Sequence, residues 1–239
     1  PPGTELKFYE EWKQKRLNWH LALGLGQENY KFHDHEKLAH YANAAADIEF
    51  KFPFGFKELE GIHSRTDFDL SAHEKFSGRK LQYFDPERNE NYVPYVVETS
   101  IGLDRMFLAL FSNCLKDEVL EDGSERTVLS LPPALAPVKA AILPLVKKDG
   151  LPEFAEKIFN DLKYDFNVIS EEKDSIGKRY RRQDAIGTPF CITVDHDSLA
   201  DGTVTLRERD TMKQERVKVE DLRRIIDEKV NFRTLLSKI

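Results

Sequence analysis

The sequence is poor in cysteine: Cys114 and Cys191 are the only two among its 239 residues. Two cysteines supply neither a disulfide framework nor a CxxC zinc motif, so a reducing cytoplasm is the expected compartment. Long apolar runs are also lacking, since the nearest candidate, residues 128–146, carries four prolines and Lys139. Such a segment does not cross a membrane as a helix, and residues 1–12 do not show the pattern of a signal peptide. We therefore expect a cytoplasmic protein without a membrane span.

The composition that remains is typical of a soluble globular protein, with 40% hydrophobic and 33% charged residues. The formal net charge of -6 argues weakly against general nucleic-acid binding. This charge is uneven, because residues 1–126 contain 16 Lys/Arg and 23 Asp/Glu, whereas residues 127–239 contain 20 and 19. An acidic, glycine-containing stretch that runs into a proline cluster, residues 116–137, indicates a linker. We predict two domains, residues 1–126 and residues 127–239.

The first domain is expected to combine helices with an antiparallel sheet. Apolar residues recur at helical spacing over residues 4–23, and a second helix is expected over residues 34–46. From residue 47 the period changes to two, which is typical of a half-buried strand, and residues 55–62 also look extended. Two further strands are expected at residues 80–84 and 92–98. Strands without long helices between them indicate an α+β fold.

The strand expected at residues 55–62 carries two acids at alternate positions. In a regular strand, Glu58 and Glu60 would share one face. Neighbouring carboxylates repel each other unless a cation lies between them or both face water. A solvated face, a magnesium site and an acid/base pair of the glycosidase kind all stay open. Downstream, Arg65 and the acids at residues 67–69 predict a local salt-bridge network.

A helix with an unusual first turn follows the last of these strands. Ser100 is placed to be its N-cap, and Asp104 suits the positive end of the helix dipole. Arg105 does not suit it, because an exposed cation there costs up to about 1 kcal/mol. A cation and a helix N-terminus together form a strong anion site, so Arg105 predicts a phosphate-bearing ligand. Five apolar residues at helical spacing are expected to pack on the core: Leu103, Met106, Phe107, Leu110 and Phe111.

The second domain is predicted to alternate strands and helices in one mixed sheet. Pro152 is near the start of one expected helix, and Gly187 closes another that begins at about Ser175. Strands are expected at residues 138–143, 164–170, 190–194, 203–209 and 215–219, before a final helix from about residue 220.

A basic segment lies within this second domain. Residues 177–184 place four cations and one aromatic ring within five consecutive residues, and a later hairpin adds further arginines. Cations of this kind contact phosphates, and an aromatic ring can stack on a splayed base. A solvated helix and hairpin explain the same pattern, so the residues alone leave both interpretations open.

Two stretches, "ELEGI…RTDFDL" and "PYVVETSIGLDRMFLALF", resemble the last part of a class II aminoacyl-tRNA synthetase catalytic domain, including its third signature motif. The resemblance extends to "LAHYANAAADIEFKFPFGFKELEGI" and through the C-terminal half, and its specific match is to the dimeric glycyl-tRNA synthetases. The second domain resembles the anticodon-binding domain that glycyl-, histidyl-, prolyl- and threonyl-tRNA synthetases share. The resemblance as a whole implies an antiparallel class II synthetase-type sheet with helices, followed by an α/β mixed-sheet anticodon-binding domain.

The resemblance also implies residue roles, with ATP and Mg²⁺ as cofactors. Arg105 and Glu58 are the expected catalytic residues, and Glu58 is also the expected metal ligand. ATP binding is implied for Glu58, Leu59, Gly102, Leu103, Asp104 and Arg105. Glycine binding is implied for Glu98, Thr99, Ser100, Ile101 and Gly102. Binding of tRNA is expected at Lys178, Arg179, Tyr180, Arg181, Arg182, Arg207 and Arg209. The sequence departs from the family at Thr99, where proline is common.

These roles amount to a glycine–tRNA ligase, which activates glycine with ATP and transfers it to the 3′ end of glycine tRNA, as a homodimer. The family's first two motifs would lie before Pro1, so the chain is expected to be a C-terminal portion that is inactive alone. The alternatives are a non-catalytic nucleic-acid-binding protein with synthetase-like architecture and a class II synthetase of another specificity. The joint presence of Glu58, Glu98, Ser100, Gly102 and Arg105 argues against the binding protein, and the match at Glu98 and Ser100 disfavours another specificity.

Overall fold

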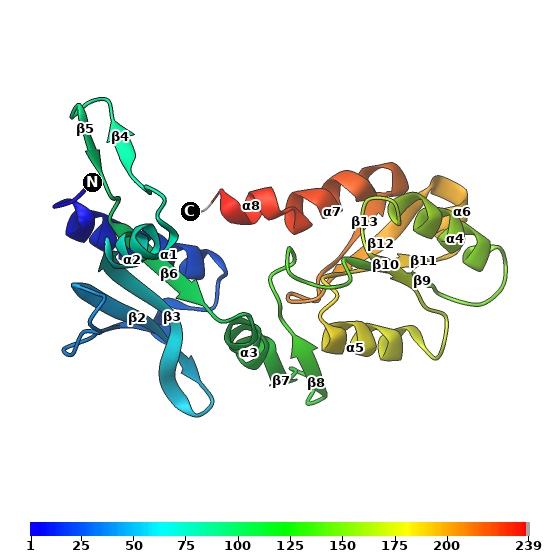
Figure 1. The fold of residues 1–239 in the computed structure, drawn as a ribbon. Coiled ribbons are helices and arrows are strands. Elements are labelled where there is room, and N and C mark those ends of the chain that lie inside the picture. Colours follow the sequence, from blue (N-terminus) through cyan, green and yellow to red (C-terminus); the bar gives the residue numbers. More distant parts are fainter. Residues whose placement is uncertain (238–239) are drawn as a thin grey trace. The chain divides into compact units, whose positions relative to one another are not determined.

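The computed structural model describes residues 1–237, which form two compact units (Figure 1). The first unit is Pro1–Ser112, and the second comprises the described residues from Asn113 onward. This division falls earlier in the chain than the predicted boundary after residue 126. The reason is that a hairpin of β7 (Leu115–Val119) and β8 (Glu125–Leu129) packs with the second unit, where Arg126 Nη1 lies 3.2 Å from Asp184 Oδ2.

The first unit is built on a four-stranded antiparallel sheet in the order β1-β2-β3-β6. These strands are β1 (Tyr30–Asp34), β2 (Ala44–Phe52), β3 (Gly55–Thr66) and β6 (Val96–Ile101). One face of the sheet packs against α1 (Glu5–Ala22), which confirms the helix expected over residues 4–23. Along β2 the alternate residues Ile48, Phe50 and Phe52 are buried, as a half-buried strand requires.

The helix expected over residues 34–46 is wrong. Asp34 ends β1, and Ala44 already begins β2, where residues 44–46 pair with β3. Three consecutive alanines favour a helix locally, but the sheet supplies main-chain partners that override this weak preference.

The first unit also contains two further helices and a hairpin. A helix, α2 (Phe68–Ser77), follows β3, and a separate two-stranded hairpin extends away from the four-stranded sheet (Figure 1). Its strands are β4 (Tyr83–Asp85) and β5 (Glu90–Tyr92), so the single strand expected over residues 92–98 is interrupted before β6. The last helix is α3 (Leu103–Cys114). The expectation that its five apolar residues pack on the core is only partly met, because Leu103, Phe107 and Phe111 are exposed while Met106 is buried.

The second unit confirms the predicted mixed sheet, in the order β10-β9-β11-β12-β13. The first three strands are parallel and the last two antiparallel: β10 (Val168–Ser170), β9 (Ala140–Pro144), β11 (Phe190–Val194), β12 (Thr203–Glu208) and β13 (Gln214–Lys218). Apolar residues of α4 (Leu151–Leu162) and α7 (Leu222–Val230) share one core with the sheet, whereas α5 (Ile176–Ile186) packs against the smaller cluster around Cys191. Gly187 closes α5 with a φ of 84°.

The remaining elements are short. The helix α6 (His196–Asp201) was not expected from the sequence, whereas α7 and α8 (Phe232–Leu236) divide the region where a final helix was expected. The 3₁₀ turns are η1 (Gln27–Asn29) and η2 (Val219–Asp221). Within residues 1–237, no helix combines the length and the apolar character that crossing a bilayer requires.

Candidate active site

The register between β3 and β6 determines which predicted residues share a face. Ser100 lies opposite Gly61, and Glu98 lies opposite His63. Because successive side chains of a strand alternate between faces, Glu98 and Ser100 point to the side of the sheet away from α1, which we call the open face. Thr99 and Ile101 point to the other side, where α1 packs. The residues expected to bind glycine are therefore divided between the two faces of the sheet. Only the side chains of Glu98 and Ser100 lie on the open face.

A β-bulge in β3 makes the side chains of Glu58 and Glu60 point to opposite faces of the sheet. Ile48 pairs with Glu60, whereas the next residue, Glu49, pairs with Glu58, so Leu59 is the extra residue. The bulge places Glu58 on the open face with Ser100 and turns Glu60 towards α1. The side chain of Glu58 is accordingly 54% exposed and that of Glu60 is fully buried. The prediction that the two acids share a face is wrong, because it assumed an uninterrupted strand.

Arg105 lies beside Glu58 at the start of α3. Its Nη1 donates a hydrogen bond to the main-chain oxygen of Glu58 and lies 3.5 Å from Glu58 Oε2. Both side chains are about half exposed, and an ion pair of this kind contributes little to stability. The guanidinium is therefore available to an anion at this helix end, while Leu59 is 1% exposed and can offer a ligand only its main chain.

The predicted N-cap role of Ser100 is wrong, because Ser100 is an exposed residue of β6. The first turn of α3 is closed instead by the main chain, in which Met106 N donates to Gly102 O at 2.9 Å. Because Ser100 does not cap the helix, its hydroxyl group lies on the open face of the sheet, on the same side as Glu98.

Glu98 is oriented by Arg65, which comes from β3. Arg65 Nη1 donates to Glu98 Oε2 at 2.7 Å, and its Nε and Nη2 donate to the two carboxylate oxygens of Asp69 at 2.6 and 3.0 Å. These bonds from Arg65 hold the pKa of Asp69 below its usual value. The guanidinium also lies over the ring of Tyr41, 4.1 Å from its centroid. The sequence indicated a local network at Arg65 but not its bond to Glu98, which is 33 residues away and becomes visible only in the sheet register.

Gly61, which has no side chain, leaves a gap on the open face of β3 next to His63 and Asp47. A Cβ atom added there would lie 2.9 Å from His63 Cε1 and 3.7 Å from Asp47 Oδ1, so a side chain would not fit without a shift. The open face thus offers a small space bordered by Ser100 and Asp47. Sequence reasoning did not single out Gly61, whose importance depends on its neighbours across two strands.

Few protein ligands are available for the metal ion that Glu58 was expected to bind. Among residues 1–237 there is no group of three or more His, Cys, Asp or Glu side chains that could hold a metal ion. Glu58 offers a single exposed carboxylate. This suits Mg²⁺, which commonly takes one or two protein carboxylates and completes its octahedron with phosphate oxygens and water.

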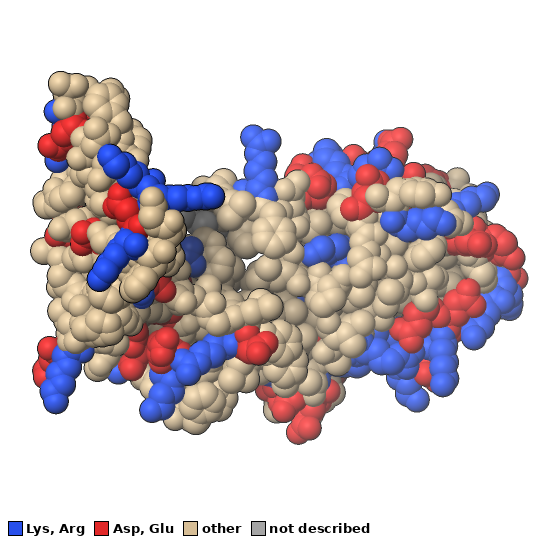
Figure 2. Space-filling view, in the orientation of Figure 1, with Lys and Arg blue, Asp and Glu red and all other residues tan. Residues whose placement is uncertain are grey.

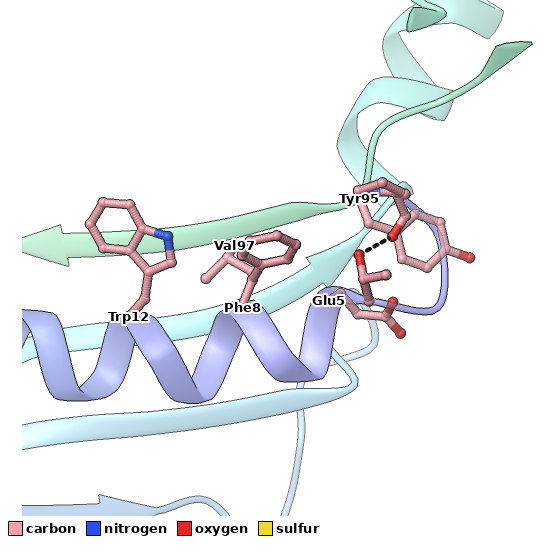
Figure 3. A pocket seen from close by; sticks show the side chains of 7 residues that line it. Glu5, Phe8, Trp12, Tyr95 and Val97 are labelled. Carbon is pink, nitrogen blue, oxygen red and sulfur yellow. Dashed lines mark hydrogen bonds between the residues drawn. The ribbon is translucent and has the colours of Figure 1, made fainter. Parts of the chain in front are cut away.

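A separate pocket of about 240 Å³ lies at the N-terminal end of α1, beside β6 (Figure 3). Phe8 and Trp12 of the helix face Val97 of the strand, and Tyr95 and Glu5 lie at its end (Figure 3). Since Val97 alternates with Glu98, this pocket is on the opposite face from the acid. The described residues that line it include none of the predicted site residues.

The structure corrects part of the expected tRNA surface in the second unit. Arg179, Arg207 and Arg209 are 2%, 4% and 1% exposed. Arg207 donates to both carboxylate oxygens of Asp184 at 2.7 and 2.9 Å. The other two donate to main-chain oxygens, which for Arg209 are those of Gly187 and Leu131. These three guanidinium groups stabilise the fold and are not placed to contact RNA.

The remaining residues of the basic segment are more accessible. Lys178 is exposed, and the side chain of Arg181 is 38% exposed. Arg182 is paired with Glu171 and Asp174 at 2.5 and 2.8 Å. The hydroxyl groups of Tyr180 and Thr193 form a hydrogen bond. Figure 2 shows basic and acidic side chains interspersed over the visible face of this unit.

The comparisons with known proteins agree with this architecture. The family described as "Anticodon binding domain" matches residues 139–229. A solved prolyl-tRNA synthetase from Cryptosporidium parvum, complexed with L-proline and AMP, superposes with a TM-score of 0.63 over 98% of this chain and 49% of its own. At 15% identity this likeness shows the fold alone, which is that of a class II aminoacyl-tRNA synthetase.

Sequence relatives are much closer. A glycine–tRNA ligase of Chlorobaculum tepidum is 55% identical over 90% of this chain and 46% of its own length. The ligase of Geobacillus thermodenitrificans is 52% identical over 97% of this chain and 50% of its own. The chain belongs to the glycine–tRNA ligase family, and it spans about half the length of the curated relatives it matches.

Substituting Gly61 tests the gap on the open face. Gly61→Ala is expected to displace the His63 ring and to lower the free energy of unfolding of the first unit by about 1 kcal/mol, the low end for overpacking. Denaturant unfolding followed by tryptophan fluorescence reports on this unit, because both tryptophans, Trp12 and Trp19, lie on α1. Adding His63→Ala should relieve the clash, so an equal loss with and without His63 would contradict the explanation.

Proposed function

We propose that this chain is part of an ATP-dependent ligase that converts glycine and ATP to glycyl-adenylate and transfers the glycyl group to the 3′ end of glycine tRNA. The observation that carries the proposal is the pair of charged groups on one face of the first unit. Glu98, held by Arg65, provides an anion for an ammonium group, and Arg105 beside Glu58 provides a cation for phosphates. The high identity to glycine–tRNA ligases supports the same activity.

The activation step needs no protein nucleophile. The glycine carboxylate attacks the α-phosphorus of ATP, a carboxyl–phosphate bond forms, and pyrophosphate leaves. The protein's contribution is to position the reactants and to neutralise charge that builds on the phosphate oxygens. Arg105 is the residue proposed for this task, with the exposed residues Gly102, Leu103 and Asp104 lining the nucleotide. Mg²⁺ held through Glu58 would further offset phosphate charge.

Glycine selection is proposed to combine an ionic contact with a lack of space. The ammonium group would bind Glu98 and the hydroxyl group of Ser100, which project from the same side of β6. His63 and Asp47 border the gap at Gly61, so an amino acid with a side chain would compete with them for this volume. Exclusion by size is effective for the smallest amino acid, whereas a pocket for a larger apolar one discriminates poorly against smaller analogues.

The second unit is proposed to bind the anticodon region of the tRNA, consistent with its family match. Among the residues expected from the sequence, the proposal retains Lys178, which is exposed, and Arg181, whose side chain is 38% exposed and lies 4.0 Å from Asp184. Arg182 could join them if it exchanged its carboxylate partners for phosphates. A cytoplasmic location and a homodimeric whole enzyme belong to the same proposal. A purely nucleic-acid-binding role is less well supported, because it gives no reason for Glu58, Glu98 and Arg105 to share one site.

Arg105→Ala, made in the ligase polypeptide that carries this chain, is expected to lower the rate of glycine-dependent ATP–pyrophosphate exchange by at least about 100-fold, as loss of a charge-stabilising donor does elsewhere. Arg105→Lys keeps the charge but not the planar pair of donors, so it should recover only part of the activity. Unchanged exchange kinetics in the alanine variant would refute the assigned role.

Glu98→Gln is expected to raise the KM for glycine by at least about tenfold, because a hydrogen bond to a charged group contributes roughly 1.5–3 kcal/mol. The KM for ATP should change little in the same exchange assay. The matched control is Glu90→Gln, which removes an exposed carboxylate from the β4–β5 hairpin. Equal effects on both substrates, or an effect in the control as large as at Glu98, would argue against an ammonium site.

Lys178→Ala with Arg181→Ala is expected to raise the KM for tRNA in aminoacylation several-fold and to leave pyrophosphate exchange unchanged. Each lost phosphate contact should also make tRNA affinity less dependent on salt. Arg224→Ala on α7 is the matched control, since Arg224 is an exposed arginine paired with Asp221 and Glu228. The role assigned to this surface fails if the pair and the control affect tRNA equally.

A further inference from the structure

The carboxylate of Asp47, which so far has only the task of bordering a gap, faces the space over Gly61. One row of cross-strand neighbours runs over the open face of the sheet: Asp47 of β2 pairs with Gly61 of β3, and Gly61 pairs with Ser100 of β6. Side chains of directly opposite residues lie on the same face. Because Gly61 has no side chain, a group that lies over it has Asp47 on one side and Ser100 on the other.

One oxygen of Asp47 is close enough to contact such a group. Asp47 Oδ1 is 3.7 Å from the position that a Cβ atom of Gly61 would take. Neighbouring strands are about 4.8 Å apart, so β2 and β6 are separated by roughly 9.6 Å across β3. This width admits two short side chains with one small group between them.

His35, the residue after β1, sets the orientation of the Asp47 carboxylate. His35 Nε2 lies 2.9 Å from Asp47 Oδ2, and an ionised carboxylate only accepts, so Nε2 is the donor. The bond engages Oδ2, and Oδ1 is the oxygen that faces Gly61. The Asp47 side chain is only 14% exposed, so its charge is weakly screened by water.

The charges around the gap favour a cation. Glu98 already has the guanidinium of Arg65 at 2.7 Å, which offsets part of its negative charge. The partner of Asp47 is an imidazole, which donates a hydrogen bond in its neutral form as well. A carboxylate that is shielded from water is stabilised by a cation beside it. Asp47 therefore adds to the gap a negative charge that its own partner need not offset.

The proposed function leaves one hydrogen bond of the substrate unassigned. An ammonium group donates three hydrogen bonds. Glu98 and Ser100 are assigned two of them, and both residues lie on the β6 side of the gap. An ammonium group over Gly61 directs its remaining donor towards β2, where Asp47 Oδ1 is the facing acceptor.

We propose that Asp47 is a specificity-determining residue for glycine: its Oδ1 accepts the third hydrogen bond of the substrate ammonium, and His35 is the positioning residue that holds the carboxylate. This inference rests on the proposed function, because it adds a ligand to the site assigned to glycine. Two carboxylates around one amino group select for positive charge, whereas the size of the gap selects only for a small molecule. Glycolate, in which a hydroxyl group replaces the ammonium group of glycine, is therefore excluded by its lack of charge.

The test compares glycine with glycolate in the whole ligase that carries this chain. Charging of tRNA with labelled glycine gives the KM for glycine, and competition by glycolate gives its Ki, whether or not glycolate is itself activated. Asp47→Asn keeps an acceptor for His35 but loses the charge. The ratio of Ki to KM is expected to fall by about tenfold or more, as the loss of a hydrogen bond to a charged group predicts. The KM for ATP should change little.

Two further variants separate binding of the ammonium from packing. His35→Phe keeps a ring but removes the donor, so it should lower the same ratio. Combined with Asp47→Asn it should lower the ratio no further, because residues that act through one another are non-additive. Asp34→Asn is the matched control, since Asp34 belongs to the same sheet but pairs with Lys13 of α1 at 2.8 Å. KM and Ki do not depend on the amount of active enzyme, so partial misfolding of a variant does not alter the ratio.

The outcomes separate this inference from the proposed function. A ratio that falls in Asp47→Asn and His35→Phe but not in Asp34→Asn supports Asp47 as a ligand of the ammonium. If Glu98→Gln lowers the ratio and Asp47→Asn does not, or if Asp47→Asn weakens glycine and glycolate equally, Asp47 only shapes the gap; the inference is then overturned while the proposed function stands. If neither Glu98→Gln nor Asp47→Asn changes the ratio, the amino group binds elsewhere, and the proposed glycine site fails together with the inference.

Discussion

The main-chain pairing of β3 with β2 and β6 is the constraint on which the candidate site depends. Side chains of a strand alternate between faces, so a change of register by one residue reverses every side chain beyond it. The pairing of β3 contains such a change at Leu59, between Glu58 and Glu60. Two acids that are two positions apart therefore have opposite environments: one is half exposed beside Arg105, and the other is fully buried against α1.

Periodic segments could be predicted well from the sequence. The first helix, the mixed sheet and the strand at residues 190–194 were expected and are present. The helix expected over residues 34–46 was wrong, because alanine-rich sequence carries only a weak preference that sheet pairing overrides. The facing of Glu58 and Glu60 could not be predicted either. A bulge inserts a residue without any change in composition, and the groups of α1 that contact the buried Glu60 are 40 and 44 residues away along the chain.

Arginine shows most clearly what composition does not reveal. Arg105 is half exposed at a helix end, Arg65 joins two carboxylates of the site, and Arg207 is buried against Asp184. In the sequence these residues are equivalent cations, and a run of them predicts a nucleic-acid surface. Their uses differ because a buried guanidinium requires carboxylate or carbonyl partners with good geometry, and those partners are distant in sequence. Arg179 and Arg182 illustrate this within one helix, since only the first is buried.

The order of groups along β3 gives the site its direction. Arg65 and His63 lie at the Glu98 end, Gly61 follows opposite Ser100, and Glu58 lies at the Arg105 end. His63 pairs with Ala45 and Glu58 with Glu49, so the bulged span between them matches four positions of β2, or about 13 Å at 3.3 Å per residue. Under the proposed function this distance must accommodate an amino acid followed by a phosphate. An ammonium at the acidic end leaves the carboxylate directed towards the cation, so a ligand with opposite charges at its two ends is held in the order that the activation step requires.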